Sequence, residues 1–117
     1  MIFTIEEFEK MLDSKEGEHC EFKEAKNRYD FETLVKYCTA LANEGGGNFV
    51  LGVIDKRPRH VVGTRAFMQP ERTRAGLIQR LHLNIDFSVL DHPDGRVLIF
   101  HVPSCPLGTP IKYKGIY

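Results

Sequence analysis

The stretch from Phe31 to Asp55 most constrains the fold, because a helix-like pattern runs into a strand-like one through three glycines. Apolar residues recur at helical spacing from Phe31 to Ala42, and Asp30 stands in front of them as a candidate N-cap. The run NFVLGVI after the glycines at 45–47 is apolar on both faces, as in a central strand. The chain therefore predicts a helix that turns sharply into the middle of a sheet.

The three glycines do not have the form of a nucleotide-binding loop. A loop of the GxxxxGK[ST] type leads from a strand into a helix and carries a lysine followed by serine or threonine. Here the direction is helix to strand and no such lysine follows, so we expect no ATP binding. Gly45 is interpreted as the residue that ends the helix. For Gly46 and Gly47 two reasons stay open, the close approach of another backbone or of a nucleic-acid phosphate.

The flanking segments complete an α+β pattern. We expect further helices over about 5–12 and 69–82 and a short half-buried strand over about 19–23, from their apolar periodicities. The segment 56–65 is expected to be a basic loop, and two alternating runs at 84–90 and 96–102 predict a C-terminal antiparallel hairpin. The predicted fold class is α+β, with a mixed β-sheet packed against two to three helices.

Length and composition place the chain among ordinary globular proteins. Its 117 residues suit one domain, so we treat 1–117 as a single domain, expected to be the N-terminal part of a longer protein. No apolar run approaches the roughly 20 residues of a membrane span, and we expect a cytoplasmic protein without a membrane partner. Three widely spaced cysteines and five scattered histidines lack zinc-ligand spacing, which indicates reduced thiols.

Charge is unevenly distributed along the chain. Residues 1–55 carry 6 Lys or Arg against 12 Asp or Glu, a net charge of −6, and residues 56–117 carry 10 against 4, a net charge of +6. This polarity produces a basic face and an acidic site, or the two halves interleave and the fields cancel. Candidate phosphate contacts are Lys23, Lys26, Arg28, Lys56, Arg57 and Arg59, with Arg72, Arg74 and Arg80 from the later helix.

Carboxylates gather near two of the predicted strands. Glu16, Glu18, Glu21 and Glu24 surround the first strand, and Asp55 ends the central one. If these strands are neighbours in the sheet, Glu21 and Asp55 converge, and hard oxygen ligands of this kind suit Mg²⁺ or Mn²⁺. The alternative is a solvated acidic surface, which the spacing alone does not exclude.

A series of motifs resembles a known family. GEHCEFKEAKN at 17–27, YCTALANEGGG at 37–47, NFVLGVIDK at 48–56 and VVGT at 61–64 are similar to the Schlafen-type AlbA-like domain. That family was formerly labelled a divergent AAA domain, and it occurs in bacterial proteins described as DNA-binding proteins or transcriptional regulators. The resemblance covers most of the chain, and it implies a module that binds DNA or RNA.

The same resemblance implies an alternative, a metal-dependent endoribonuclease. Schlafen ribonucleases of animals use a Glu, Glu, Asp triad, and the matching positions here are Glu16, Glu21 and Asp55, as catalytic residues and as ligands of Mg²⁺ or Mn²⁺. Those enzymes pair two such domains around RNA, so the resemblance implies a homodimer for this chain. We predict nucleic-acid binding as the first function and the ribonuclease as the second. An ATP-binding or protein-interaction module is the third hypothesis.

Overall fold

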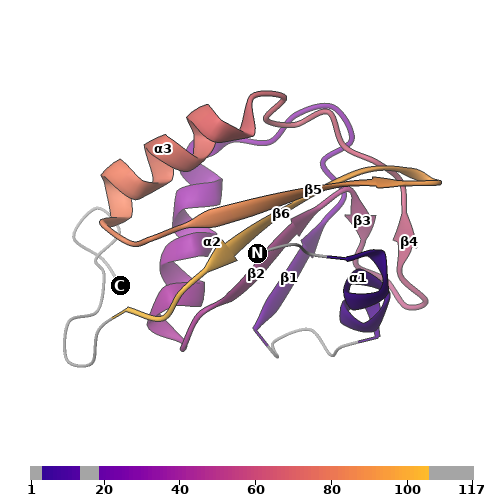
Figure 1. The fold of residues 1–117 in the computed structure, drawn as a ribbon, viewed down its shortest axis with the longest axis horizontal. Helices are drawn as coiled ribbons and strands as arrows, with labels where there is room; N and C mark the ends of the chain where they lie inside the picture. Colours follow the sequence, from indigo (N-terminus) through magenta and orange to yellow (C-terminus); the bar gives the residue numbers. More distant parts are fainter. Residues whose placement is uncertain (1–3, 14–18, 106–117) are drawn as a thin grey trace.

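The computed structural model describes residues 4–13 and 19–105, which form helices and strands in an α+β arrangement (Figure 1). The helices are α1 (Ile5–Leu12), α2 (Phe31–Asn43) and α3 (Pro70–Leu81). The strands are β1 (Cys20–Lys23), β2 (Gly47–Leu51), β3 (Val53–Ile54), β4 (His60–Val61), β5 (Asp86–His92) and β6 (Gly95–Val102). The predicted fold class is confirmed. No helix in the described part of the chain is long and apolar enough to cross a membrane.

The long strands form one mixed sheet in the order β1-β2-β6-β5, and β3 and β4 form a separate antiparallel pair. Strands β1 and β2 are parallel, whereas β6 is antiparallel to both β2 and β5. Helix α2 supplies the crossover that a parallel pair requires. The carboxyl ends of β1 and β2 therefore point to the same edge of the sheet.

Apolar side chains cover both faces of this sheet. On one face, α2 and α3 bury Leu34 and Leu77 against Phe49 and Phe100 of the strands. On the other face, Phe8 of α1 is fully buried among side chains of β1, β2 and β6. Because β2 contributes to both clusters, the prediction of a central strand is confirmed.

Helix α2 begins and ends as the sequence predicts. A carboxylate oxygen of Asp30 accepts a hydrogen bond from the Thr33 N–H at 2.9 Å, which caps the first turn. At the other end Gly45 has φ +105°, and the Gly46 N–H donates to the Leu41 carbonyl at 2.7 Å, a common helix ending. A Cβ on Gly46 would lie 2.8 Å from the carbonyl oxygen of Val102. Close approach of another backbone thus accounts for the extra glycine.

The run NFVLGVI is not one strand, which corrects the prediction. Gly52, with φ +102°, separates β2 from β3, and β3 pairs with β4 in the second sheet. The Gly52 N–H donates to the Lys23 carbonyl at 2.8 Å, while its own carbonyl accepts from Val62 N–H at 2.8 Å. Asp55 consequently follows β3 instead of the central strand. The predicted basic loop also contains a strand, because β4 lies within it.

The cysteines are free, as predicted. Cys20 and Cys38 are buried, and Cys105 is partly buried. Burial raises the pKa of the Cys38 thiol to about 12, so this thiol stays protonated at neutral pH. Cys38 therefore serves as a small apolar residue of the core.

Candidate functional site

The carboxyl ends of the parallel strands β1 and β2 meet the segment 62–65. The N–H of Gly52 donates to the Lys23 carbonyl, and the N–H of Arg65 donates to the Lys26 carbonyl, each at 2.8 Å. Open α/β sheets commonly bind ligands beyond the carboxyl ends of their strands. This edge of the sheet is therefore the candidate position of a ligand site.

Glu21 lies on β1 in register with the buried Phe49 of β2, and its side chain is 23% exposed. Burial raises the pKa of its carboxyl, the Lys23 ammonium group 4.0 Å away opposes this, and the carboxylates of Asp55 and Glu44 raise the pKa further. A carboxylate in such surroundings gains from a nearby cation more than one on an open surface does. Glu21 thus has the electrostatic setting of a cation ligand or of a buried structural acid.

Asp55 lies close enough to Glu21 to affect its pKa, which agrees with the expected convergence of these two carboxylates. Its Oδ1 also accepts a hydrogen bond from Nε of Arg59 at 3.4 Å. Glu16, the third predicted ligand, lies outside the described residues. Within 4–13 and 19–105, no three His, Cys, Asp or Glu side chains are grouped so as to hold a metal ion. The metal triad therefore stays a prediction.

Arg59 serves the fold, which corrects its place among the phosphate-binding candidates. Its side chain is only 2% exposed. The guanidinium group lies 4.2 Å over the ring of Phe22 and donates to the Leu12 carbonyl at 2.7 Å. A guanidinium group held between an aromatic ring, a carbonyl and the Asp55 carboxylate is not presented to a phosphate chain.

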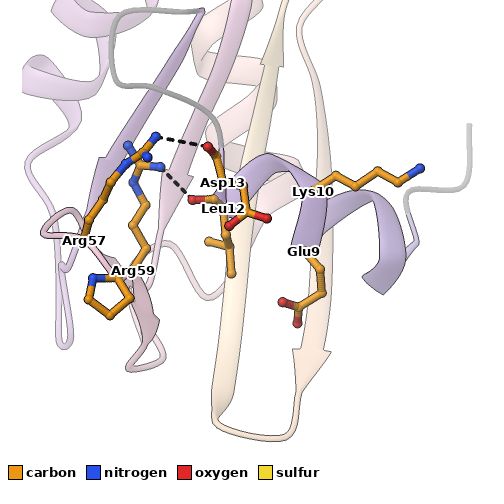
Figure 2. Close-up of a pocket in the computed structure, with 7 residues that line it drawn as sticks. Glu9, Lys10, Leu12, Asp13, Arg57 and Arg59 are labelled. Carbon is orange, nitrogen blue, oxygen red and sulfur yellow. Dashed lines mark hydrogen bonds between the residues drawn. The ribbon is translucent and has the colours of Figure 1, made fainter.

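Arg57 is exposed, but it too reaches helix α1, as Figure 2 shows. Its Nη2 donates to the Asp13 carbonyl at 3.0 Å, so both arginines of this loop bind carbonyls at the end of α1. A hollow of about 520 Å³ lies beside them, lined by Glu9, Lys10, Leu12, Asp13, Arg57, Pro58 and Arg59. Because this lining contains both signs of charge, the hollow has no clear preference for an anion.

The other predicted cations differ in accessibility. Lys26, Arg28 and Lys56 are exposed. Lys26 is 60% exposed and lies 3.8 Å from the exposed Glu24, an ion pair that contributes little in water. Lys23 is 31% exposed, and its ammonium group lies 4.7 Å over a tyrosine ring of α2. Four of the six candidates are therefore exposed, and of these Arg57 already donates to the Asp13 carbonyl.

Two arginines of α3 form ion pairs. Arg80 makes two contacts with the Glu32 carboxylate, at 2.7 and 3.1 Å, and Arg74 lies 3.4 Å from Asp86. The Arg80 pair joins the basic half of the chain to the acidic half, so at this point the two halves interleave. These two arginines add less to a basic face than their number suggests.

Sequence reasoning missed two arginines that lie near Lys26. Arg65 ends the run VVGTR, whose glycine and threonine indicate a turn. This turn is the feature of the sequence that could have pointed to Arg65. Arg96 lies in the strand β6, and its run 96–102 is predicted from the sequence only as one strand of a hairpin. Neither position carries a motif that marks it as functional.

His101 has a structural role on the sheet. Its Nε2 lies 2.8 Å from the Ser88 hydroxyl and its Nδ1 lies 2.8 Å from the Asn48 amide oxygen, so it connects β5, β6 and β2. Burial lowers the pKa of the imidazole, against smaller opposite effects of Asp86 and Glu7. The neutral ring can donate to Asn48 and accept from Ser88, which satisfies both of its nitrogens.

A family profile matches most of the chain. The family is described as Schlafen, AlbA_2, and the match covers residues 16–117. The chain belongs to the Schlafen AlbA_2 family. The resemblance drawn from the motifs is thereby confirmed. No curated protein matches this Schlafen AlbA_2 chain significantly.

Two solved structures similar to this Schlafen AlbA_2 domain illustrate the likeness. The DIP2311 protein of Corynebacterium diphtheriae has a TM-score of 0.65 and 23% identity, over 92% of this chain and 23% of that one. The N-terminal domain of a RecG-related protein of Nitrosomonas europaea, described as an ATP-dependent DNA helicase relative, has a TM-score of 0.57 and 20% identity, over 93% and 75%. At these identities the likeness concerns the fold, and the chain spans under a quarter of the Corynebacterium protein.

Proposed function

We propose that this domain binds nucleic acid through the phosphate backbone. The observation that carries the proposal is the set of exposed cations, Lys26, Arg28 and Lys56, on a Schlafen AlbA_2 fold. The similarity to a domain of a protein named for a DNA helicase supports a role close to nucleic acid. Lysine and arginine contacts to phosphates position a protein without reading sequence, so we expect low sequence preference.

The test is the salt dependence of binding. With about three phosphate contacts, log Kobs should fall with log salt at a slope of about −2.7, which lowers affinity about 40-fold between 50 and 200 mM salt. Fluorescence anisotropy with labelled duplex DNA, duplex RNA and single strands measures this slope and the preferred ligand. The proposal would be contradicted if the domain bound none of these nucleic acids at ~50 mM salt, or if its affinity did not depend on salt.

A matched pair of variants locates the contacts. The double change Arg28→Gln with Lys56→Gln removes two charges and should lower the slope by about 2, whereas Lys36→Gln, which removes one charge at an exposed position of α2, should leave it unchanged. Equal salt slopes in wild type and in these variants would show that Arg28 and Lys56 lie outside the interface.

The second candidate is a metal-dependent ribonuclease. It is favoured by the Asp55 carboxylate, which raises the pKa of the Glu21 carboxyl, because a divalent cation beside two neighbouring carboxylates relieves their repulsion. Glu21 and Asp55 are hard oxygen donors of the kind that Mg²⁺ and Mn²⁺ take. In such an enzyme the cation would stabilise charge on the reacting phosphate, while Lys26 and Arg28 would hold the flanking chain.

Glu21→Gln and Glu24→Gln distinguish a ribonuclease from a binding module. We expect Mn²⁺-dependent cleavage of tRNA or duplex RNA to be lost in Glu21→Gln and in EDTA, and retained in Glu24→Gln, whose side chain is 51% exposed. Cleavage should also weaken as pH falls through the raised pKa of Glu21, because a ligand carboxylate must be ionised. Equal cleavage, or equal inactivity, of wild type and Glu21→Gln would remove this candidate.

A further inference from the structure

A hollow of about 340 Å³ lies at the edge where β1 and β2 end. It shares no lining residue with the hollow of Figure 2. It is lined by Lys26, Val62, Gly63, Thr64, Arg65, Met68 and Arg96. Its volume is at the small end of the range of ligand sites in proteins. We propose that this hollow is a phosphate-binding site that takes one phosphodiester group of a nucleic-acid backbone, an inference that rests on the proposed function.

The charge of the lining points to an anion. Lys26, Arg65 and Arg96 are its only ionisable members among the described residues, and all three are basic. Glu24 lies 3.8 Å from the Lys26 ammonium group, and Asp91 acts on Arg96 from outside the lining. These two carboxylates weaken the positive field without reversing it, because three cations border the hollow itself.

Arg96 forms a fixed cationic wall of the hollow. Its Nη1 donates to the carbonyls of Thr64 at 3.2 Å and Ala66 at 3.0 Å, and its Nη2 donates to the Phe67 carbonyl at 3.1 Å. A guanidinium group has five N–H donors, so these bonds leave donors for a ligand. Burial lowers the pKa of Arg96, and an arginine nevertheless stays charged in proteins. A partly buried cation of this kind gains from an anionic neighbour.

The two cations at the rim are held next to each other by the backbone. The Arg65 N–H donates to the Lys26 carbonyl at 2.8 Å, and the Thr64 hydroxyl donates to the Ala25 carbonyl at 2.5 Å. Among the described residues, no hydrogen bond or ion pair engages the Arg65 side chain, which is exposed. An arginine beside a lysine on a rigid turn suits the bidentate geometry of a phosphate.

The backbone of this turn does not itself receive the ligand. The N–H groups of Gly63, Thr64 and Arg65 donate to Gly52, Arg96 and Lys26 carbonyls respectively. The contacts to an anion therefore come from side chains, unlike those of a glycine-rich phosphate loop. Met68 at the rim is 64% exposed and offers an apolar surface to the sugar next to the phosphate.

The experiment compares Arg65→Gln, Arg65→Lys and the control Lys36→Gln in the duplex-binding assay. Arg65→Gln should weaken binding about 5-fold to 10-fold at ~50 mM salt and lower the salt slope by about 1, while Arg65→Lys should keep the slope and the control should match wild type. If Arg65→Gln binds with wild-type affinity and slope, this inference is overturned and the proposed function stands.

A second measurement separates the two proposals if wild type binds no nucleic acid. Inorganic phosphate is titrated into ¹⁵N-labelled protein, and amide shifts are followed by NMR. Saturable shifts at Gly63, Thr64 and Arg65 that disappear in Arg65→Gln would support an anion site even where the proposed function fails. Absence of saturable shifts at these amides in wild type would refute the site.

Discussion

Replacing Phe49 with alanine is expected to lower the free energy of unfolding by about 3–5 kcal/mol. Phe49 lies on the central strand β2 and is fully buried. Its ring packs against those of Tyr29 and Tyr37, with centroids 5.6 and 5.4 Å away, and Phe100 faces it across the ladder. Because a domain of this kind is stable by only about 5–15 kcal/mol, the variant would lose a large part of its stability.

Chemical denaturation of Phe49→Ala and of Phe49→Leu measures this effect. Leucine fills most of the space, so its cost should stay below about 1.5 kcal/mol. A loss in Phe49→Ala of less than about 1 kcal/mol would mean that the site collapses around the alanine, contrary to the packing between α2 and the sheet.

Gly52→Ala should cost about 2–4 kcal/mol, the second large effect. Alanine is strained at φ +102°, and the added Cβ would lie 2.8 Å from the Arg96 carbonyl oxygen, where a backbone has to move. Gly76→Ala is the matched control, since that residue lies in α3 and its Cβ would meet the ring edge of Phe31 at 3.1 Å. Helix propensity favours alanine there, so the control should stay within about 1 kcal/mol of wild type.

Thermal unfolding followed by circular dichroism compares the two glycine variants. Equal melting temperatures would show that the chain tolerates a side chain at the bend between β2 and β3. The expected order, with Gly52→Ala clearly below Gly76→Ala, would confirm that the positive φ and the close Arg96 carbonyl together exclude a side chain at the bend.

The regular elements were predictable because local signals agree with the fold. Helix α2 has an unbroken apolar period and a capping aspartate, and the hairpin of β5 and β6 has alternation around a turn. The break at Gly52 was not predictable, because a run that is buried on both faces has the same apolar sequence pattern whether the strand is straight or bent. What sets the bend is a pair of distant partners, Lys23 and Arg96, which no local pattern reveals.

The candidate site was predictable only in part. The pairing of β1 with β2 follows from a helix between two parallel strands, but Asp55 comes near Glu21 from the end of β3, beyond the break at Gly52. By contrast, Arg59 looks in the sequence like the exposed Lys56, although it lies over Phe22. A long side chain can bury its stem or its charge, and spacing does not distinguish these outcomes. Arg65 was missed for the opposite reason, since a single arginine after a turn carries no pattern.

Because β6 lies between β2 and β5, these strands cannot join into one sheet until β6 has been synthesised. Asn48 of β2 pairs with His101 of β6, so the central ladder joins segments that leave the ribosome far apart in time. Contacts of such long range slow folding, because a large loop must close before any pairing is gained. A nascent chain that has not yet reached Gly95 leaves one edge of β2 open, with apolar Phe49 and Val50 beside it. An open edge of this kind can pair with a second chain, so this domain depends on β6 for protection from aggregation.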